Sequence, residues 1–287
     1  MPNQDPILNL LRELAAADPH IRAAALSGSR TNPNAVTDAF SDYDVVFFTD
    51  DLPASRQENF PALLERTLGP LLILQCPDEM DDGAASAGRY YTYLCQFERS
   101  RIDLRLMARE QAGWYFSTEP GLTPLLDKDR LLNGLTAIGP EVFAIIPPDL
   151  RAFENCCNEF YWTALYVVKG LCRDQLDYAA WHLDRCVREE LIRMIAYRRC
   201  LTEAAPVALG AGNKYLPRLL SPEEYAEFTK TYALGSRRDC ARALLLALRL
   251  FQRCSQAVAE RLNVPLPGYC LRVQGACLRL LAEYHIL

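Results

Sequence analysis

Residues 21–48 read IRAAALSGSRTNPNAVTDAFSDYDVVFF. The apolar run Ile21 to Leu26 ends at Ser27-Gly28-Ser29, which predicts a strand followed by a turn. A polar loop comes next, and Tyr43 to Phe48 then predicts a second strand. This second strand is apolar on both of its faces, which is typical of a strand inside a sheet rather than at its edge.

The sequence around this stretch mixes helical and strand patterns. Apolar residues spaced three and four apart predict an opening helix over 7–14, and a second helix is expected over 57–68. Because helices and strands do not alternate strictly, we expect an α/β (α+β) N-terminal region with a mixed sheet and flanking helices. The further strands are expected at 71–75, 90–97 and 102–106.

The pattern becomes helical after Pro147-Pro148. From 151 to 200 the chain has no proline and a single glycine, Gly170, which predicts two long helices, or three if Gly170 breaks the first. Ser221 with Glu224 predicts a helix start by a capping box. Two more helices are expected over 236–262 and 267–285, so we predict an N-terminal domain at 1–147 and an all-helical bundle at 148–287.

Composition excludes several classes of protein. The 287 residues carry a formal net charge of −5, which argues against a nucleic-acid-binding coat. The N-terminus lacks the pattern of a signal peptide, and no apolar run is long enough to cross a bilayer. We therefore expect a cytoplasmic protein with no membrane or nucleic-acid partner. The 11 cysteines show no Cys-x-x-Cys pair and fall mostly in apolar segments, which favours buried structural thiols.

Three aspartates form the first candidate site. Asp42 and Asp44 lie two residues apart at a strand start, so their side chains share a face and can bind a hard cation such as Mg²⁺. The alternative is a polar turn that enters the strand. Asp103 lies on the polar face of its strand between Arg101 and Arg105, where a third carboxylate can complete a metal cluster. Its alternative is a salt-bridged surface strand.

The turn after the first strand is the second candidate. Gly28 allows backbone N–H groups to approach a phosphate closely, and the Ser29 hydroxyl and Arg30 guanidinium add donors. An ordinary turn is the alternative interpretation. The spacing fits neither a P-loop nor a dinucleotide-binding fingerprint.

The combination of these motifs resembles a known family. A strand with Gly-Ser, a strand with Asp-x-Asp and a later strand with Asp form the constellation of polymerase-beta-like nucleotidyltransferases. At closer range the chain resembles the bacterial aminoglycoside 6-adenylyltransferases (streptomycin adenylyltransferases), over most of its length. The segments that carry this resemblance are Gly28-Ser29-Arg30-Thr31-Asn32-Pro33-Asn34, Asp42-Tyr43-Asp44-Val45-Val46, Arg101-Ile102-Asp103-Leu104, Tyr166–Leu171, Val187–Leu191 and Lys214-Tyr215-Leu216.

The resemblance implies a cationic aminoglycoside acceptor, for which carboxylates and aromatic walls are suitable. The helical half offers Glu159 with Trp162, and Asp177 with Trp181 and Asp184 at helical spacing. Glu159 is the preferred acidic residue for the acceptor or for the catalytic base. Lys169 and Lys214 are candidate triphosphate contacts. The alternatives are a core tryptophan, solvated surface charges and ordinary surface lysines.

These inferences together predict a two-domain enzyme with its active site in the cleft between the domains. It would use Mg²⁺ and transfer AMP from ATP to an aminoglycoside hydroxyl, with streptomycin as the first candidate, and release pyrophosphate. Two alternatives stay open: nucleotidyl transfer to another acceptor, and a non-catalytic nucleotide-binding module on the same fold.

Overall fold

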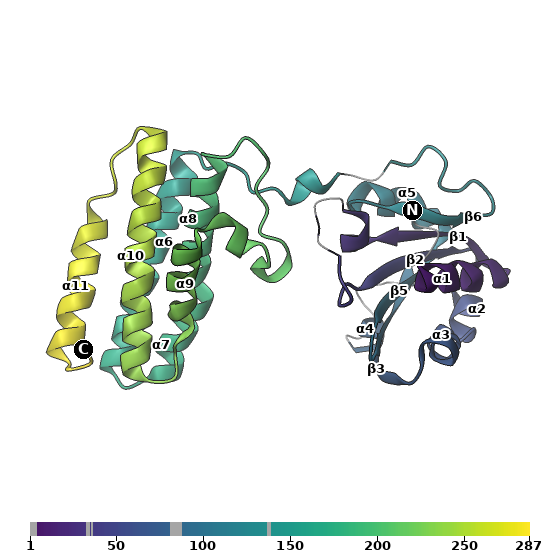
Figure 1. The fold of residues 1–287 in the computed structure, drawn as a ribbon, viewed down its shortest axis with the longest axis horizontal. Coiled ribbons are helices and arrows are strands. Elements are labelled where there is room, and N and C mark those ends of the chain that lie inside the picture. The colour runs from purple at the N-terminus through teal and green to yellow at the C-terminus, as the bar shows by residue number, and fades with distance from the viewer. Residues whose placement is uncertain (1–4, 33–34, 36, 81–87, 137–138) are drawn as a thin grey trace. The chain divides into compact units, whose positions relative to one another are not determined.

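The computed structural model describes residues 5–32, 35, 37–80, 88–136 and 139–287. The chain forms two compact units, Met1–Val142 and Phe143–Leu287, called unit 1 and unit 2 below (Figure 1). Pro33 and Asn34 of the polar loop lie outside the described residues.

Unit 1 is built on a mixed sheet with the strand order β3-β4-β5-β2-β1-β6. Strands β2 and β5 pair in parallel, and the other neighbouring strands pair antiparallel. The mixed sheet confirms the predicted fold class, and β2 lies inside the sheet as its two apolar faces indicate. The strands are β1 (Ile21–Ser27), β2 (Tyr43–Thr49), β3 (Leu71–Gln75), β4 (Tyr90–Phe97), β5 (Arg101–Ala108) and β6 (Thr123–Asp127).

Helices cover both faces of this sheet. On one face α1 (Pro6–Ala17) and α3 (Phe60–Leu68) pack against alternate residues of β2 and β5, including Phe47 and Leu104. On the other face α5 (Ala112–Thr118) packs Tyr115 and Phe116 against Phe48. Because side chains alternate along a strand, Asp44 and Asp103 belong to the α5 face.

The structure contains elements of unit 1 that the sequence patterns did not predict. These are α2 (Leu52–Gln57), α4 (Pro77–Met80), α5 and the edge strand β6. The helix expected over 57–68 begins only at Phe60, because Asn59 has a left-handed backbone (φ 38°) and caps the helix with its side chain. A short 3₁₀ turn follows β1 at Gly28–Thr31, and others lie at Arg109–Gln111 and Pro140–Phe143.

Unit 2 is all helical in its described residues. Its helices are α6 (Leu150–Cys172), α7 (Leu176–His182), α8 (Arg188–Cys200), α9 (Pro222–Thr229), α10 (Arg237–Leu262) and α11 (Tyr269–Glu283), with 3₁₀ turns at Ala211–Asn213, Leu216–Leu219 and Lys230–Tyr232. A π-helical segment, Leu183–Val187, joins α7 to α8 without a loop. The predicted capping box at Ser221 is confirmed.

Gly170 does not break the first long helix. It lies inside α6, where a Cβ would meet Tyr178 and Ala179 of α7 at about 3 Å. The glycine therefore allows α7 to pack closely on α6, and the chain turns only after Cys172.

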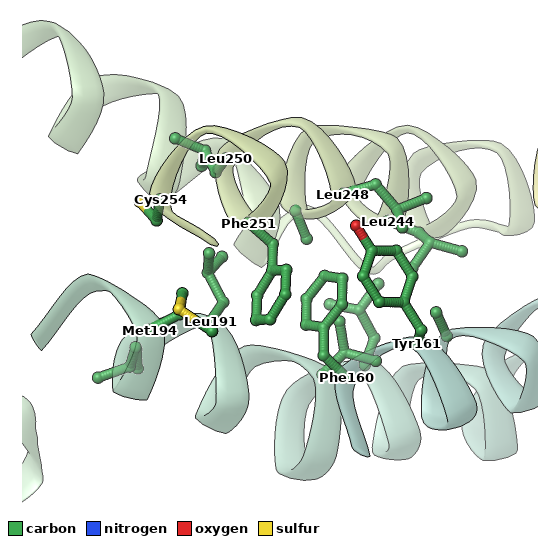
Figure 2. Close-up of a cluster of buried hydrophobic side chains, with 14 of the residues drawn as sticks. Phe160, Tyr161, Leu191, Met194, Leu244, Leu248, Leu250, Phe251 and Cys254 are labelled. Atoms are coloured by element: carbon green, nitrogen blue, oxygen red, sulfur yellow. The ribbon is translucent and has the colours of Figure 1, made fainter. Parts of the chain in front are cut away.

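The core of unit 2 lies between α6, α8 and α10. Phe160 of α6 stacks on Phe251 of α10 with ring centroids 3.7 Å apart, and Tyr161 meets both rings edge-on (Figure 2). Most cysteines are buried, and all are free thiols, as the sequence patterns predict. Among the described residues, no helix has the length and apolar character needed to span a membrane.

Candidate active site

The first candidate site begins where β1 ends. Gly28 follows β1 with a positive φ of 70°, and a Cβ at this position would collide with the carboxylate of Asp44. Ser27 pairs with Asp44 in the β1–β2 register. Only glycine can adopt this positive φ and also leave room for the carboxylate of Asp44. Residue 28 is therefore glycine because of packing as well as because of the turn.

Strand register then brings the aspartates together. Asp44 pairs directly with Asp103 across the parallel β2–β5 ladder. Burial, and after it the negative charges of Asp103, Asp42 and Glu119, raise the pKa of Asp44 to about 6, whereas Arg101 opposes them. A carboxyl group that is both buried and close to other carboxylates is common in functional sites.

Arg101 binds two of these aspartates. Its Nε and Nη2 each donate a hydrogen bond of 2.8 Å to Asp103, one to each carboxylate oxygen. Its Nη1 lies 3.8 Å from Oδ2 of Asp42. The sequence left open whether Asp103 is a metal ligand or part of a salt-bridged strand, and the structure shows the salt bridge. Arg105, the other neighbour, instead lies near the Tyr90 ring.

Arg30, the predicted triphosphate contact, has its partners within the chain that leads into β2. Its guanidinium lies 3.6 Å from the centre of the Tyr43 ring and donates to the carbonyls of Asp42 and Ser41 at 3.0 and 2.9 Å. It also lies 3.7 Å from Asp5. Arg30 therefore holds the chain that enters β2. Ser29 lies in the 3₁₀ turn after Gly28, within the same connection.

The donor set fits a hard divalent cation in its chemistry, because carboxylate oxygens are the ligands that Mg²⁺ prefers. Asp42, Asp44 and Asp103 are the residues that would hold it. In the described part of the chain, however, no three His, Cys, Asp or Glu side chains converge as a ready metal-binding group. Both oxygens of Asp103 accept hydrogen bonds from Arg101.

The second candidate site lies on unit 2, where α6 meets α7. The aromatic surface consists of Trp162, Tyr166, Tyr178, Trp181 and His182. Both tryptophans are more than half exposed, at 56% and 57%. His182 is the centre of the group, with ring centroids 5.2, 4.4 and 4.9 Å from Tyr166, Tyr178 and Trp181, and the indole N–H of Trp162 donates to the Tyr166 hydroxyl. A group of exposed aromatic side chains is typical of an interaction surface.

Acidic residues flank the aromatic surface. Glu159 and Asp177 are exposed on α6 and α7. Asp184 lies in the π-helical segment and accepts a hydrogen bond of 3.1 Å from the buried Arg188. Short π-helical segments inside helices are frequent at functional sites, which agrees with a site on this face.

The two lysines of the prediction lie apart in unit 2. Lys169 is exposed on α6, with its ammonium 5.8 Å from the Tyr166 ring. Lys214 follows the 3₁₀ turn Ala211–Asn213 and lies near Tyr215. Neither contact involves a carboxylate of the first site.

Sequence reasoning missed Tyr166, Tyr178 and His182 as members of the aromatic surface. The spacing of Trp162 to Tyr166 and of Tyr178 to His182 is four residues, which places each pair on one helix face. That signal was present in the sequence. The contact between the pairs depends on how α7 packs on α6, which the sequence pattern does not contain.

The fold and the aspartates at the β2–β5 pair define a nucleotidyltransferase. The family model described as streptomycin adenylyltransferase matches residues 1–270. An aminoglycoside 6-adenylyltransferase of Bacillus subtilis is 32% identical over 271 residues, covering 94% of each chain, and one of Campylobacter jejuni is 30% identical over 287 residues, covering 100% of this chain and 98% of that one. This chain belongs to the streptomycin adenylyltransferase family.

A solved structure is also similar. A crystal structure of an aminoglycoside 6-adenyltransferase from Bacillus subtilis matches 95% of this chain and 96% of its own, with 26% sequence identity and a TM-score of 0.48.

Proposed function

We propose that this enzyme transfers AMP from ATP to a hydroxyl of an aminoglycoside, with streptomycin as the first candidate, and releases pyrophosphate. The observation that carries the proposal is the direct pairing of Asp44 with Asp103 beside Gly28. Membership of the streptomycin adenylyltransferase family supports the acceptor class, and it argues against the alternative of a non-catalytic binding module.

The reaction forms a bond from the acceptor oxygen to the α-phosphorus and breaks the bond to the β-phosphate oxygen, so that pyrophosphate leaves. Mg²⁺ bound by Asp42, Asp44 and Asp103 would neutralise the triphosphate charge. The backbone N–H groups after Gly28 and the Ser29 hydroxyl are suited to hold phosphate oxygens, because the turn offers its donors without a side chain at residue 28.

A base must accept the proton of the acceptor hydroxyl. Asp103 is poorly suited, because the two N–H groups of Arg101 occupy the oxygens that a base would use. Glu159 is exposed and lies three residues before Trp162 on the same helix, next to the aromatic surface. We therefore keep Glu159 as the proposed base.

The aromatic surface is the proposed acceptor site. An aminoglycoside carries several positive charges and many C–H groups on its rings, and aromatic faces bind both cations and sugar rings. Glu159, Asp177 and Asp184 supply negative charge around these rings. The same carboxylates favour binding at low salt, since screening weakens such attraction.

The test is pyrophosphate release by the purified protein with Mg-ATP and, one at a time, streptomycin and other aminoglycosides. We expect streptomycin-dependent release and a streptomycin product heavier by one AMP. Glu159→Gln should lower kcat more than it changes KM if Glu159 is the base. Release with another acceptor, and none with streptomycin, would replace the acceptor while keeping the reaction. No release with any acceptor would refute the proposal.

A further inference from the structure

The three aspartates of unit 1, Asp42, Asp44 and Asp103, already have a cation beside them, the guanidinium of Arg101. Among the described residues, the ion pairs made by Asp42 and Asp103 all go to Arg101. The Arg101 side chain is 40% exposed, whereas the Asp103 side chain that it binds is 19% exposed. The negative charge that attracts a metal ion is therefore partly neutralised before any metal binds.

The geometry of this contact bears directly on metal binding. Arg101 donates two parallel hydrogen bonds of 2.8 Å to Asp103. This bidentate arrangement is the strongest that an arginine and a carboxylate form. Mg²⁺ and Mn²⁺ must find free oxygen lone pairs and must give up bound water to reach them. A divalent cation that uses Asp103 fully has to displace at least one of these hydrogen bonds.

A nucleotide changes this balance. Its triphosphate brings negative charge and oxygen ligands of its own, which bind both a divalent cation and a guanidinium. The triphosphate thus offers Arg101 a further anionic partner besides Asp103 and Asp42. The nucleotide-free protein therefore holds Arg101 on Asp103, and the nucleotide-bound protein can release it.

We propose that Arg101 is a resident counter-cation that keeps divalent-cation binding weak until a nucleotide is bound. This inference rests on the assignment of Asp42, Asp44 and Asp103 as metal ligands in the proposed function, but it does not depend on the acceptor. Metal binding is then coupled to nucleotide binding by one side chain that competes for the same carboxylate.

The experiment measures Mn²⁺ binding to the nucleotide-free, full-length protein by electron paramagnetic resonance, with Mg²⁺ as competitor. Arg101→Gln should bind Mn²⁺ about tenfold more tightly than the wild type. A change of about tenfold in affinity is the size of effect expected from removing one partly screened contact between two charges. Arg101→Lys keeps the charge and should stay within about twofold of the wild type, because a point charge still competes. Asp44→Asn in the Arg101→Gln background should remove the gained site.

Arg99→Gln is the matched control. It removes the same charge from an exposed arginine in the connection between β4 and β5, and it should leave Mn²⁺ affinity unchanged. Unchanged or weaker Mn²⁺ binding by a folded Arg101→Gln protein would overturn the proposal. An equal gain from Arg99→Gln would also overturn it, since general charge would then explain the effect.

A second measurement covers the case in which Arg101→Gln does not fold. The side-chain Nε signal of Arg101 in ¹⁵N-labelled wild-type protein reports its hydrogen bond to Asp103. We expect this signal to move on addition of Mg²⁺ with a non-hydrolysable ATP analogue, and to stay in place with Mg²⁺ alone at the same concentration. A signal that does not move with both ligands would contradict the proposal. Neither measurement requires turnover, so a failure here is distinct from a failure of the aminoglycoside assignment.

Discussion

The aspartates of unit 1 and the aromatic surface of unit 2 are positioned in different ways. Asp44 and Asp103 are fixed by hydrogen-bonded strand register, because a shift of either strand by one residue would turn its aspartate to the opposite face of the sheet. Trp162 and Trp181 are placed by helical spacing and by the packing of α7 on α6. The difference suggests that the first site serves the fixed chemistry of nucleotidyl transfer, and that the second can vary with the acceptor.

The largest effect should come from the carboxylate at the centre of the first site. Asp44→Asn removes metal-binding charge without removing volume, so we expect kcat to fall by about 10³-fold, the range for loss of an electrostatic catalytic group. The measurement is steady-state pyrophosphate release, with folding checked by circular dichroism. Glu58→Gln, at an exposed glutamate outside both sites, should keep wild-type turnover. Near-normal turnover of a folded Asp44→Asn protein would remove Asp44 from the site.

A glycine pair tests how tightly register fixes the first site. Gly28→Ala places a Cβ against Asp44 and also strains the backbone, because φ is positive at this residue. Gly134→Ala causes the same kind of backbone strain (φ 77°), but its Cβ would lie in open space. We expect Gly28→Ala to lower the free energy of unfolding by about 3 kcal/mol and Gly134→Ala by about 1 kcal/mol. Urea unfolding measures both. Equal losses would show that the contact with Asp44 is unimportant.

The aromatic surface should respond through substrate affinity instead. Trp181→Ala removes an exposed ring and should raise KM for the aminoglycoside about tenfold, with KM for Mg-ATP unchanged. Trp114→Ala is the control, because Trp114 is 48% exposed on α5 of unit 1. If the two variants raise KM alike, the effect is not specific to the aromatic surface. If neither does, the acceptor binds elsewhere.

The smallest effect is a pH-dependent gain in stability. The pKa of Asp44 is raised from 3.8 to about 6, so folding favours its neutral form. That stabilisation is complete below pH 3.8 and is lost as the pH rises through 6, where the charged form destabilises the fold. In EDTA without nucleotide, Asp44→Asn should therefore be more stable than the wild type by about 1 kcal/mol at pH 7, after allowance for solvent screening.

The difference in stability should vanish near pH 4, where both side chains are neutral in the fold. Urea unfolding at the two pH values gives the comparison directly. A constant difference from pH 4 to pH 7 would show that neither burial nor the neighbouring carboxylates raise the pKa of Asp44.

The places of Asp44 and Asp103 in the sheet could be predicted from the sequence, because local patterns determine them. Alternation along 102–106 placed Asp103 on the polar face, and the double apolar face of 43–48 placed β2 inside the sheet. The sequence could not decide between Asp103 as a metal ligand and Asp103 as a salt-bridge partner. Both roles need a carboxylate on the polar face of the strand, so the alternation of polar and apolar residues is the same for each. The role of Arg30 also required three-dimensional information, because its partners are backbone carbonyls and the Tyr43 ring.

The residues of the second candidate site could be identified from the sequence only in part. Its two tryptophans and three acidic residues were identified by charge and spacing, but His182 at its centre was not. The π-helical segment Leu183–Val187 gives no sign in the sequence, since its residues continue a helical pattern into α8. The contacts of this segment are tertiary ones. The Arg188 guanidinium donates to Asp184 and also to the Thr231 carbonyl.

The parallel β2–β5 pair has a consequence for the order of folding. Strands β4 and β5 are neighbours in sequence and pair antiparallel, so they can form a hairpin early from local contacts. β2 lies more than fifty residues before β5, and its pairing needs a long loop to close. We therefore expect Asp44 to meet Asp103 late, in a step that brings two carboxylates together. Arg101 lies beside Asp103 on the same strand, so we expect it to reduce the repulsion between the two carboxylates in that step.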